Sequence, residues 1–409
     1  MRNCIIAQSG GPTSVINASV MGVVAKNNKI NYYDNVFAGL NGIEGILQEK
    51  FFNLSSLTNE QIETIKYTPA AALGSCRYKL KDVNSCTEEY DRLFEIMEKN
   101  NIETFFYAGG NDSMDTVNKL SNYAELKNKN LKFFGIPKTI DNDLPIMDHT
   151  PGYGSAAKFI ASTILENYLD TNVYCKKNVF IVETMGRDTG WLAASAIAAR
   201  INNKCVVDYI YLPESIFNEE KFLMDVKKKL ETQDNVFVVV SEGIRNAEGT
   251  FISELNTQSK KDTFGHVQLG GVGAYLKHIL IEKGIVSKVR SLEISTSQRC
   301  AMHCASQRDI DESFSLGEAA LEYSTYGENG MMVALRRTSS FPYMCEPIII
   351  HTSNIANQIK YVPTDWINSE SNHLNDSALE YISPLIQGQP NFILENGLPK
   401  FLTLRELIS

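Results

Sequence analysis

The sequence predicts an α/β protein built on mainly parallel sheets. Short apolar runs recur along the chain, and each is followed by a turn of Gly, Asn, Asp or Ser and then by a helical pattern. Five such runs occur by residue 240, so we expect two sheets rather than one. The 409 residues are 43% hydrophobic and 21% charged, as expected for a globular protein of more than one domain.

Each expected strand ends at a polar loop. Right-handed crossovers bring the carboxyl ends of parallel strands to one edge of a sheet, where ligands bind. We therefore expect these loops to form the rim of a site. In chain order, residues 4–7 precede Ser9-Gly10-Gly11, residues 104–108 precede Gly109-Gly110-Asn111-Asp112-Ser113, residues 131–136 precede the loop 137–143, residues 179–182 precede Met185-Gly186-Arg187, and residues 236–240 precede Ser241-Glu242-Gly243.

We expect a domain boundary near Pro151-Gly152, just after the loop 137–143. This divides the chain into residues 1–150 and residues 151–308. The last stretch, 340–409, contains several Pro and Asn residues and has weaker periodicity. It is therefore expected to be a cover or interface segment.

Composition excludes several classes of protein. The net charge of −9 argues against sequence-independent nucleic-acid binding, which depends on basic surface. We find no run of about 18 apolar residues that could span a membrane, and no signal peptide at the start. The eight cysteines are scattered and are expected to be reduced thiols. These features predict a cytoplasmic protein.

The most informative loop is Pro137-Lys138-Thr139-Ile140-Asp141-Asn142-Asp143. It places one lysine and two carboxylates at a strand end. Lysine can hold a phosphate while a carboxylate acts as a base on a hydroxyl. The simpler alternative is a polar turn with an Asx-type bond to the backbone.

Two glycine loops suit a phosphate group. Gly10-Gly11 and Gly109-Gly110 each join a strand to a helix, so that backbone amides and the helix dipole face an anion. Neither loop is a Walker A or a G-x-G-x-x-G sequence. Asp112 would repel a phosphate unless a divalent cation bridged them. The sequence therefore predicts Mg²⁺ in this site.

Further charged residues lie at turns or strand ends. Arg77, Arg187 and Arg299 are candidates for phosphate recognition, because the guanidinium group binds phosphate in a bidentate way. Glu242 could accept hydrogen bonds from sugar hydroxyls. Taken singly, each of these side chains could equally be an ordinary surface charge.

The ordered set of motifs resembles the phosphofructokinase family over about residues 1–335. The specific parts are Thr139-Ile140-Asp141-Asn142-Asp143 and Met185-Gly186-Arg187. The other blocks are Gly10-Gly11 with Asn17, Gly74-Ser75 with Arg77, Gly109-Gly110-Asn111-Asp112-Ser113, Ser241-Glu242-Gly243 and Gln298-Arg299.

This resemblance implies two similar three-layer α/β domains with the active site between them. Residues 1–150, completed by part of 309–409, would bind the phosphoryl donor and Mg²⁺, and residues 151–308 the sugar phosphate. The implied reaction moves a phosphoryl group to the 1-hydroxyl of fructose 6-phosphate, giving fructose 1,6-bisphosphate in glycolysis. A sugar-phosphate site near a subunit interface would make the protein a homodimer or homotetramer.

Two positions indicate the donor. In the family that this chain resembles, ATP-using members have Gly-Gly-Asp-Gly-Ser in the second glycine loop. In the loop that matches 137–143 they have Pro-Gly-Thr-Ile-Asp-Asn-Asp. Here Asp112 and Lys138 replace the two glycines, which resembles the pyrophosphate-dependent branch. Asp112 would occupy the space of a nucleotide α-phosphate, and Lys138 could pair with the pyrophosphate that leaves in a reversible reaction. Residues 264–271 also resemble that branch.

The resemblance assigns roles position by position. Asn111 stands where many members have an aspartate linked to the metal. The implied catalytic residues are Asp141 as the base with Lys138, Arg77 and Arg187; the substrate-binding residues are Gly11, Thr139, Asp143, Met185, Gly186, Glu242, Arg299 and Arg308; and the metal residues are Asn111 and Asp112.

Three alternatives remain open. The chain could be an ATP-dependent 6-phosphofructokinase if a nucleotide tolerates Asp112 and Lys138. Sedoheptulose 7-phosphate could be the acceptor, because it has a matching 1-hydroxyl and terminal phosphate. A non-catalytic sugar-phosphate-binding subunit would keep the fold, but the presence of Asp141, Arg77 and Arg187 argues against it.

Overall fold

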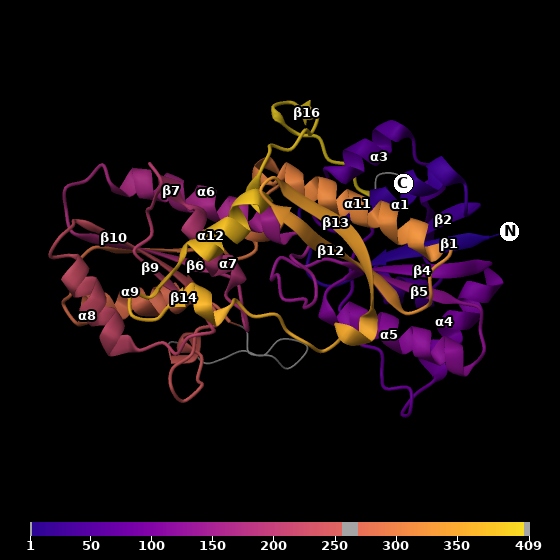
Figure 1. The fold of residues 1–409 in the computed structure, drawn as a ribbon, viewed down its shortest axis with the longest axis horizontal. Coiled ribbons are helices and arrows are strands. Elements are labelled where there is room, and N and C mark those ends of the chain that lie inside the picture. The colour runs from indigo at the N-terminus through magenta and orange to yellow at the C-terminus, as the bar shows by residue number, and fades with distance from the viewer. Residues whose placement is uncertain (1, 256–268, 405–409) are drawn as a thin grey trace.

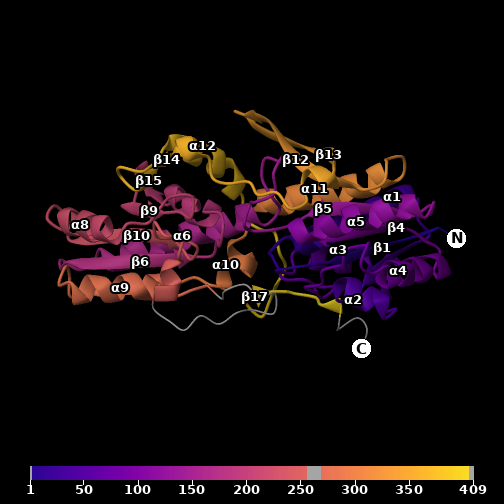
Figure 2. The same cartoon turned by 90° about the horizontal axis from the view of Figure 1, so that it is seen from below.

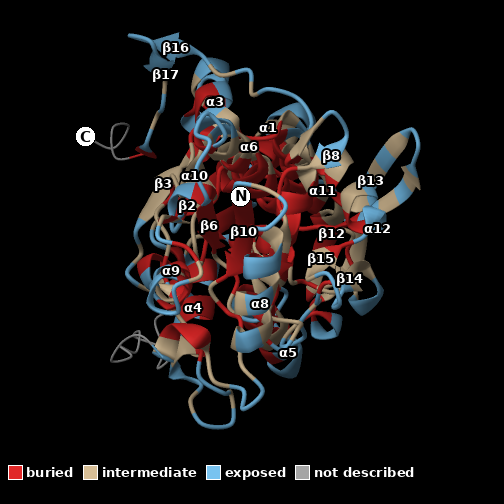
Figure 3. Ribbon diagram, turned by 90° about the vertical axis from the view of Figure 1, so that its left-hand side faces the viewer, coloured by how far each residue is buried: buried red, intermediate tan, exposed pale blue. Residues whose placement is uncertain are grey.

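The computed structural model describes residues 2–255 and 269–404 and shows two lobes side by side (Figure 1). Each lobe has a sheet covered by helices on both faces, as the edge-on view shows (Figure 2). The predicted α/β class with mainly parallel sheets is confirmed. Buried residues follow the sheets and the inner faces of the helices (Figure 3).

The first lobe contains a seven-stranded sheet in the order β13-β12-β5-β4-β1-β2-β3. Its central pairs are parallel, and only β2–β3 and β12–β13 are antiparallel. The last two strands therefore join a sheet that begins more than 300 residues earlier in the chain. The strands are β1 Asn3–Gln8, β2 Asn35–Gly39, β3 Phe51–Asn53, β4 Ile102–Gly109, β5 Lys132–Pro137, β12 Met331–Ser340 and β13 Tyr343–His351.

The second lobe contains a four-stranded parallel sheet in the order β11-β6-β10-β9. The middle of each central strand is apolar and buried, because helices cover both faces of the sheet. The five strands expected from the sequence are β1, β4, β5, β6 and β10. The strands of this sheet are β6 Asn178–Thr184, β9 Tyr209–Tyr211, β10 Asn235–Ser241 and β11 Val289–Glu293.

Helices complete the three layers of each lobe. In the first lobe, one core joins α1, α3 and α11 to the sheet, and another joins α2, α4 and α5 to its other face. In the second lobe, α6, α7 and α12 share one core, and α8 and α9 the other. The helices are α1 Ile16–Ile30, α2 Gly42–Leu47, α3 Asn59–Lys66, α4 Glu88–Lys99, α5 Asn111–Leu126, α6 Tyr153–Thr171, α7 Trp191–Ala194, α8 Glu219–Lys229, α9 Val272–Glu282, α10 Ser297–Cys300, α11 Gln307–Ser324 and α12 Asp376–Ile382.

The chain after β13 runs between the lobes. Val362 and Ile382 pack into the core of the second lobe, and Leu404 returns to the core of the first. Within the described residues, no helix is both long and apolar enough to cross a bilayer. The short strands are β7 Arg200–Ile201, β8 Lys204–Cys205, β14 Ile367–Asn368, β15 His373–Leu374, β16 Leu394–Glu395 and β17 Leu398–Pro399.

One carboxylate fastens the lobes together. Asp309, in the first turn of α11, accepts hydrogen bonds from the backbone amides of Gly152 at 2.9 Å and Ser155 at 2.8 Å. These amides lie at the start of α6, where a helix has no backbone partners of its own. A first-lobe helix thus caps the first helix of the second lobe, directly after the loop 137–143.

Candidate active site

Three loops of the first lobe meet where β1, β4 and β5 end side by side. The Ser75 hydroxyl donates to the Gly10 carbonyl at 2.7 Å, and the Gly10 amide donates to the Cys76 carbonyl at 3.1 Å. The Ser113 hydroxyl, at the start of α5, donates to the Ser9 hydroxyl at 2.9 Å. The predicted glycine loops and the turn before Arg77 therefore form one continuous surface.

Lys138 joins the two glycine loops. Its amide donates to the Gly109 carbonyl at 2.9 Å, and its ammonium group donates to the Gly11 carbonyl at 2.7 Å. The side chain is only 3% exposed. Burial lowers the pKa of Lys138 to about 8, although the charge of Asp141 opposes the shift. The lysine is therefore held in place where the two glycine loops meet.

Asp141 lies in the turn that follows Lys138. The Thr139 hydroxyl donates to its carboxylate at 3.2 Å, and its own amide donates to that hydroxyl at 3.1 Å. Loss of hydration raises the pKa of Asp141, while the Thr139 hydrogen bond and the charge of Arg299 oppose this. A carboxylate with a raised pKa and cations nearby is suited to accept a proton.

Asp143 shares this environment. One of its carboxylate oxygens, Oδ1, is buried and has no hydrogen-bond partner among the residues that the structure describes. Burial, followed by repulsion from Asp141, raises the pKa of Asp143 to about 7. The charge on one carboxylate thus disfavours ionisation of the other, and such shifted pKa values are common in catalytic sites.

The second lobe adds the loops after β6 and β10. The Gly186 amide donates to the Glu242 carboxylate at 3.3 Å, and Gly186 has a φ of 131°, which favours glycine. Burial raises the pKa of Glu242 to about 7. The Met185 amide donates to the Gln298 side chain at 3.3 Å, and the Thr189 hydroxyl donates to the Asp141 carbonyl at 3.3 Å. The two lobes therefore face each other across the site.

The arginines differ in position. A methyl group placed on Gly11 would lie 3.7 Å from Cζ of Arg299, so Arg299 reaches the first glycine loop of its own chain. Arg187 acts electrostatically on Asp141 and Glu242. Arg77 is exposed and acts on Lys138.

Arg308 lies apart from these groups. Its guanidinium is exposed and stacks on the ring of Tyr343 at 5.1 Å, with no contact to the site loops among the described residues. Its role in binding the sugar phosphate stays a prediction.

The two predicted metal residues begin α5. Asn111 is engaged on both sides by the C-terminal segment: its amide oxygen accepts from the Asn357 backbone amide at 2.6 Å, and its amide nitrogen donates to the Gln358 carbonyl at 2.5 Å. Asp112 is exposed, and within the described parts of the chain no donor bonds its carboxylate. Asp112 can therefore face a ligand, whereas Asn111 helps to hold the segment that follows β13.

Lys360 was not among the predicted site residues. Its ammonium group donates to the Asn142 side chain at 3.2 Å and to the Asp148 carbonyl at 2.8 Å. The segment around it has weak periodicity and no motif. The only signal in the sequence is a lysine between two apolar residues, Ile359 and Tyr361.

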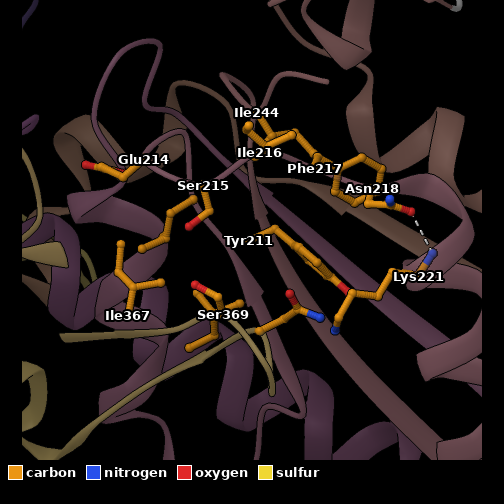
Figure 4. A pocket seen from close by; sticks show the side chains of 13 residues that line it. Tyr211, Glu214, Ser215, Ile216, Phe217, Asn218, Lys221, Ile244, Ile367 and Ser369 are labelled. Carbon is orange, nitrogen blue, oxygen red and sulfur yellow. Dashed lines mark hydrogen bonds between the residues drawn. The ribbon is translucent and has the colours of Figure 1, made fainter. Parts of the chain in front are cut away.

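A cavity of about 440 Å³ lies elsewhere in the second lobe, between β9, the start of α8 and the turn after β14 (Figure 4). None of the predicted site residues lines it. Glu214, on its wall, accepts from the backbone amides of Gly190 and Val362, both at 3.0 Å. Of the block 264–271 noted in the sequence, residues 264–268 lie outside the described residues.

Comparisons with known proteins agree on one family. A family model described as phosphofructokinase matches residues 3–292. A pyrophosphate–fructose 6-phosphate 1-phosphotransferase from Halomonas elongata is 38% identical over 98% of this chain and 96% of its own length. A sulfofructose kinase from Alkalicoccus urumqiensis is 33% identical over 83% of this chain and 85% of its own.

A solved structure shares the whole fold. The crystal structure of a pyrophosphate-dependent phosphofructokinase from Marinobacter aquaeolei superposes with a TM-score of 0.87 at 34% identity. The match covers 98% of this chain and 95% of the other.

Proposed function

The chain belongs to the phosphofructokinase family, and from this premise we propose that it transfers a phosphoryl group from pyrophosphate to the 1-hydroxyl of fructose 6-phosphate. The products are fructose 1,6-bisphosphate and phosphate. The reaction is reversible in this proposal, so the enzyme can form fructose 1,6-bisphosphate in glycolysis or convert it back to fructose 6-phosphate.

The position of Lys138 is the observation that carries the choice of donor. Its ammonium group lies against Gly11, at the junction of the two glycine loops. ATP-using members of the family have a glycine at this position, so the lysine adds a positive charge that can pair with the negative charge of pyrophosphate. Asp112 adds an exposed negative charge at the start of α5. That charge disfavours the α-phosphate of a nucleotide.

The proposed chemistry is proton removal followed by phosphoryl transfer. Asp141 takes the proton of the sugar 1-hydroxyl, and the oxygen attacks the nearer phosphorus of pyrophosphate while the bond to the bridging oxygen breaks. Lys138, Arg187 and Arg77 stabilise the charge that builds up on the phosphoryl oxygens. Because Lys138 is held against Gly11 before the substrates bind, little reorganisation of this charge accompanies the step.

The sugar phosphate is proposed to lie on the second lobe. Glu242 would accept hydrogen bonds from the sugar hydroxyls, and Met185 and Gly186 would contact the sugar. Arg299 would bind the 6-phosphate, and Thr139 would orient the transferring group beside Asp141. Arg308 is kept as a further candidate for the terminal phosphate.

Mg²⁺ fits the residues present. Asp112 offers an exposed carboxylate that no donor in residues 2–255 and 269–404 bonds, and Oδ1 of Asp143 lies at the same edge of the sheet. Among the described residues, no three His, Cys, Asp or Glu side chains form a metal site of their own. We therefore propose that Asp112 holds the ion together with pyrophosphate oxygens. When bound, Mg²⁺ would neutralise phosphate charge.

A coupled assay tests the proposal. Purified protein with fructose 6-phosphate and Mg²⁺ is given either pyrophosphate or ATP, and fructose 1,6-bisphosphate is measured. We expect turnover with pyrophosphate and little or none with ATP. Turnover with ATP alone would contradict the choice of donor. Sedoheptulose 7-phosphate and sulfofructose, supplied in place of fructose 6-phosphate, define the acceptor.

Assembly and location complete the proposal. The tip of the β12–β13 hairpin exposes Phe341 and Met344, and exposed apolar side chains of this kind are often buried between subunits. We propose a homodimer or homotetramer, which sedimentation would test. All eight cysteines are free thiols, which suits the reducing cytoplasm.

A further inference from the structure

The loop between Asp141 and Asp148 contains unusual backbone. Asn142 and Ile146 have φ values of 53° and 64°, in the left-handed region. For a β-branched residue such as Ile146 this conformation is a rare outlier. Its side chain is 57% exposed, so burial of that side chain does not compensate the strain. Other contacts must therefore hold the loop.

Lys360 supplies four of these contacts. Its ammonium group donates to the Asn142 side chain at 3.2 Å and to the carbonyls of Met147 at 3.4 Å and Asp148 at 2.8 Å. Its backbone amide donates to the Asp143 carbonyl at 2.8 Å. One residue therefore binds the loop at its start, next to the second aspartate, and at its end.

Lys360 is itself held in place. Its ammonium group lies 5.0 Å above the ring of Trp191, and its carbonyl accepts from the Trp191 indole at 2.9 Å. The apolar neighbours Ile359 and Tyr361 are 41% and 53% exposed, whereas the lysine points inward. Hydrophobicity alone would favour the opposite arrangement. The order of these residues thus points to a use for the inward ammonium group.

We propose that Lys360 is a positioning residue of the active site, which holds the Asp141–Asp148 loop so that Asp141 meets the acceptor hydroxyl. This inference rests on the proposed function. Lys360 lies outside the residues 3–292 that the family model matches, so the C-terminal segment becomes part of the catalytic unit. Its charge also lies close enough to Asp143 to offset repulsion between the two carboxylates.

The role has a measurable signature. Displacement of a reacting group by about 1 Å can lower a rate about 10²-fold without loss of binding. For Lys360→Met, which keeps the unbranched side chain up to its fourth heavy atom and removes its charge, we expect kcat to fall about 10²-fold. The KM values for fructose 6-phosphate and pyrophosphate should change less than about threefold, since Lys360 positions the loop and is assigned no contact with either substrate.

Lys132→Met is the matched control. Lys132 likewise donates to two backbone carbonyls, those of Ser324 and Gly327 at 3.0 and 3.1 Å, but it lies at the end of β5 opposite to the site loop. We expect its kcat to match the wild type. If Lys132→Met lowers kcat as much as Lys360→Met does, the effect of Lys360 is general destabilisation and the proposal is wrong.

A second readout does not depend on activity. Hydrogen exchange of the peptide 139–150 should quicken in Lys360→Met and stay unchanged in Lys132→Met. Tyr381→Phe provides a milder variant, because its hydroxyl accepts from the Asn142 side chain at 2.9 Å and donates to the Asp148 carbonyl. We expect the same pattern with a smaller fall in kcat. Wild-type exchange of this peptide, or unchanged kcat in both variants, would overturn the inference even if the wild type uses pyrophosphate as proposed.

Discussion

The site contains two loops that carry aspartates, and they differ in how far the carboxylates are exposed to water. Asp141 and Asp143 lie in a loop closed over by Lys360, and their pKa values are raised by lost hydration. Asp112, at the start of α5, is exposed to water. The desolvated pair is suited to proton transfer. The exposed carboxylate is suited to selecting a ligand by charge, because a ligand can approach it directly from solvent.

The largest expected effect concerns the desolvated loop. Asp141→Ala should lower kcat at least about 10²-fold, the range of general base catalysis. The measurement is the initial rate at saturating pyrophosphate and fructose 6-phosphate. Asp141→Asn, which keeps the size of the side chain, should be as slow, and its thermal midpoint should not fall because a desolvated charge is removed. Turnover equal to wild type in either variant would refute the assigned base.

The next effect concerns the exposed carboxylate together with Lys138. Asp112→Gly combined with Lys138→Gly should raise the ratio of ATP to pyrophosphate activity, by at least about tenfold, or about 1.4 kcal/mol of discrimination. Each single variant should give part of the change. The measurement is kcat/KM for both donors in all four proteins. No gain with ATP in the double variant would mean that other residues exclude the nucleotide.

A smaller effect concerns pH. The carboxylate form of Glu242 is needed to accept hydrogen bonds from sugar hydroxyls, and its pKa is about 7. Above this pH the group is charged, so the KM for fructose 6-phosphate should fall several-fold as pH rises through about 7. The pKa of Glu242 is higher in the folded protein than its unfolded value of roughly 4.3. The free energy of unfolding should therefore fall as the pH rises from about 4.3 to about 7. In Glu242→Gln this pH step in KM should vanish, and its persistence would assign it to another group.

The smallest effect is on stability. Asp112 lies in the first turn of α5, where a negative charge favours the helix dipole. Asp112→Asn should therefore lower the free energy of unfolding by only about 0.5 kcal/mol. Denaturant titration measures this change beside Asp141→Asn, which should be neutral or stabilising. Similar stability changes at the two positions would remove the distinction between the loops.

The sequence was sufficient for the parts of the site that are local. The apolar strand before each loop and the glycines after it fixed the places of Gly11, Lys138 and Glu242 at carboxyl ends of strands. Their spacing along the chain, with the family resemblance, was enough to propose the reaction. The assigned roles of the individual site residues stay predictions.

Contacts between distant segments could not be predicted. Asn142 and Lys360 are 218 residues apart, and no periodic pattern links them. The side-chain amide oxygen of Asn111 could bind a metal ion. Instead, the side-chain amide forms hydrogen bonds with the backbone at Asn357 and Gln358. Such pairings depend on the path of the chain after β13, which weak periodicity leaves open. Desolvation of Asp141 and Asp143 is likewise a property of the assembled lobes.

The carboxylate of Asp309 has a mechanical consequence. It ties α11 to the start of α6, so one point of the second lobe cannot move away from the first without breaking two hydrogen bonds. We expect any opening of the site to be a rotation about this point, with the largest travel at the far end of the second lobe. The loop with Asp141 and Asp143 lies beside the pivot, and its geometry would be the last to change as substrates enter and products leave.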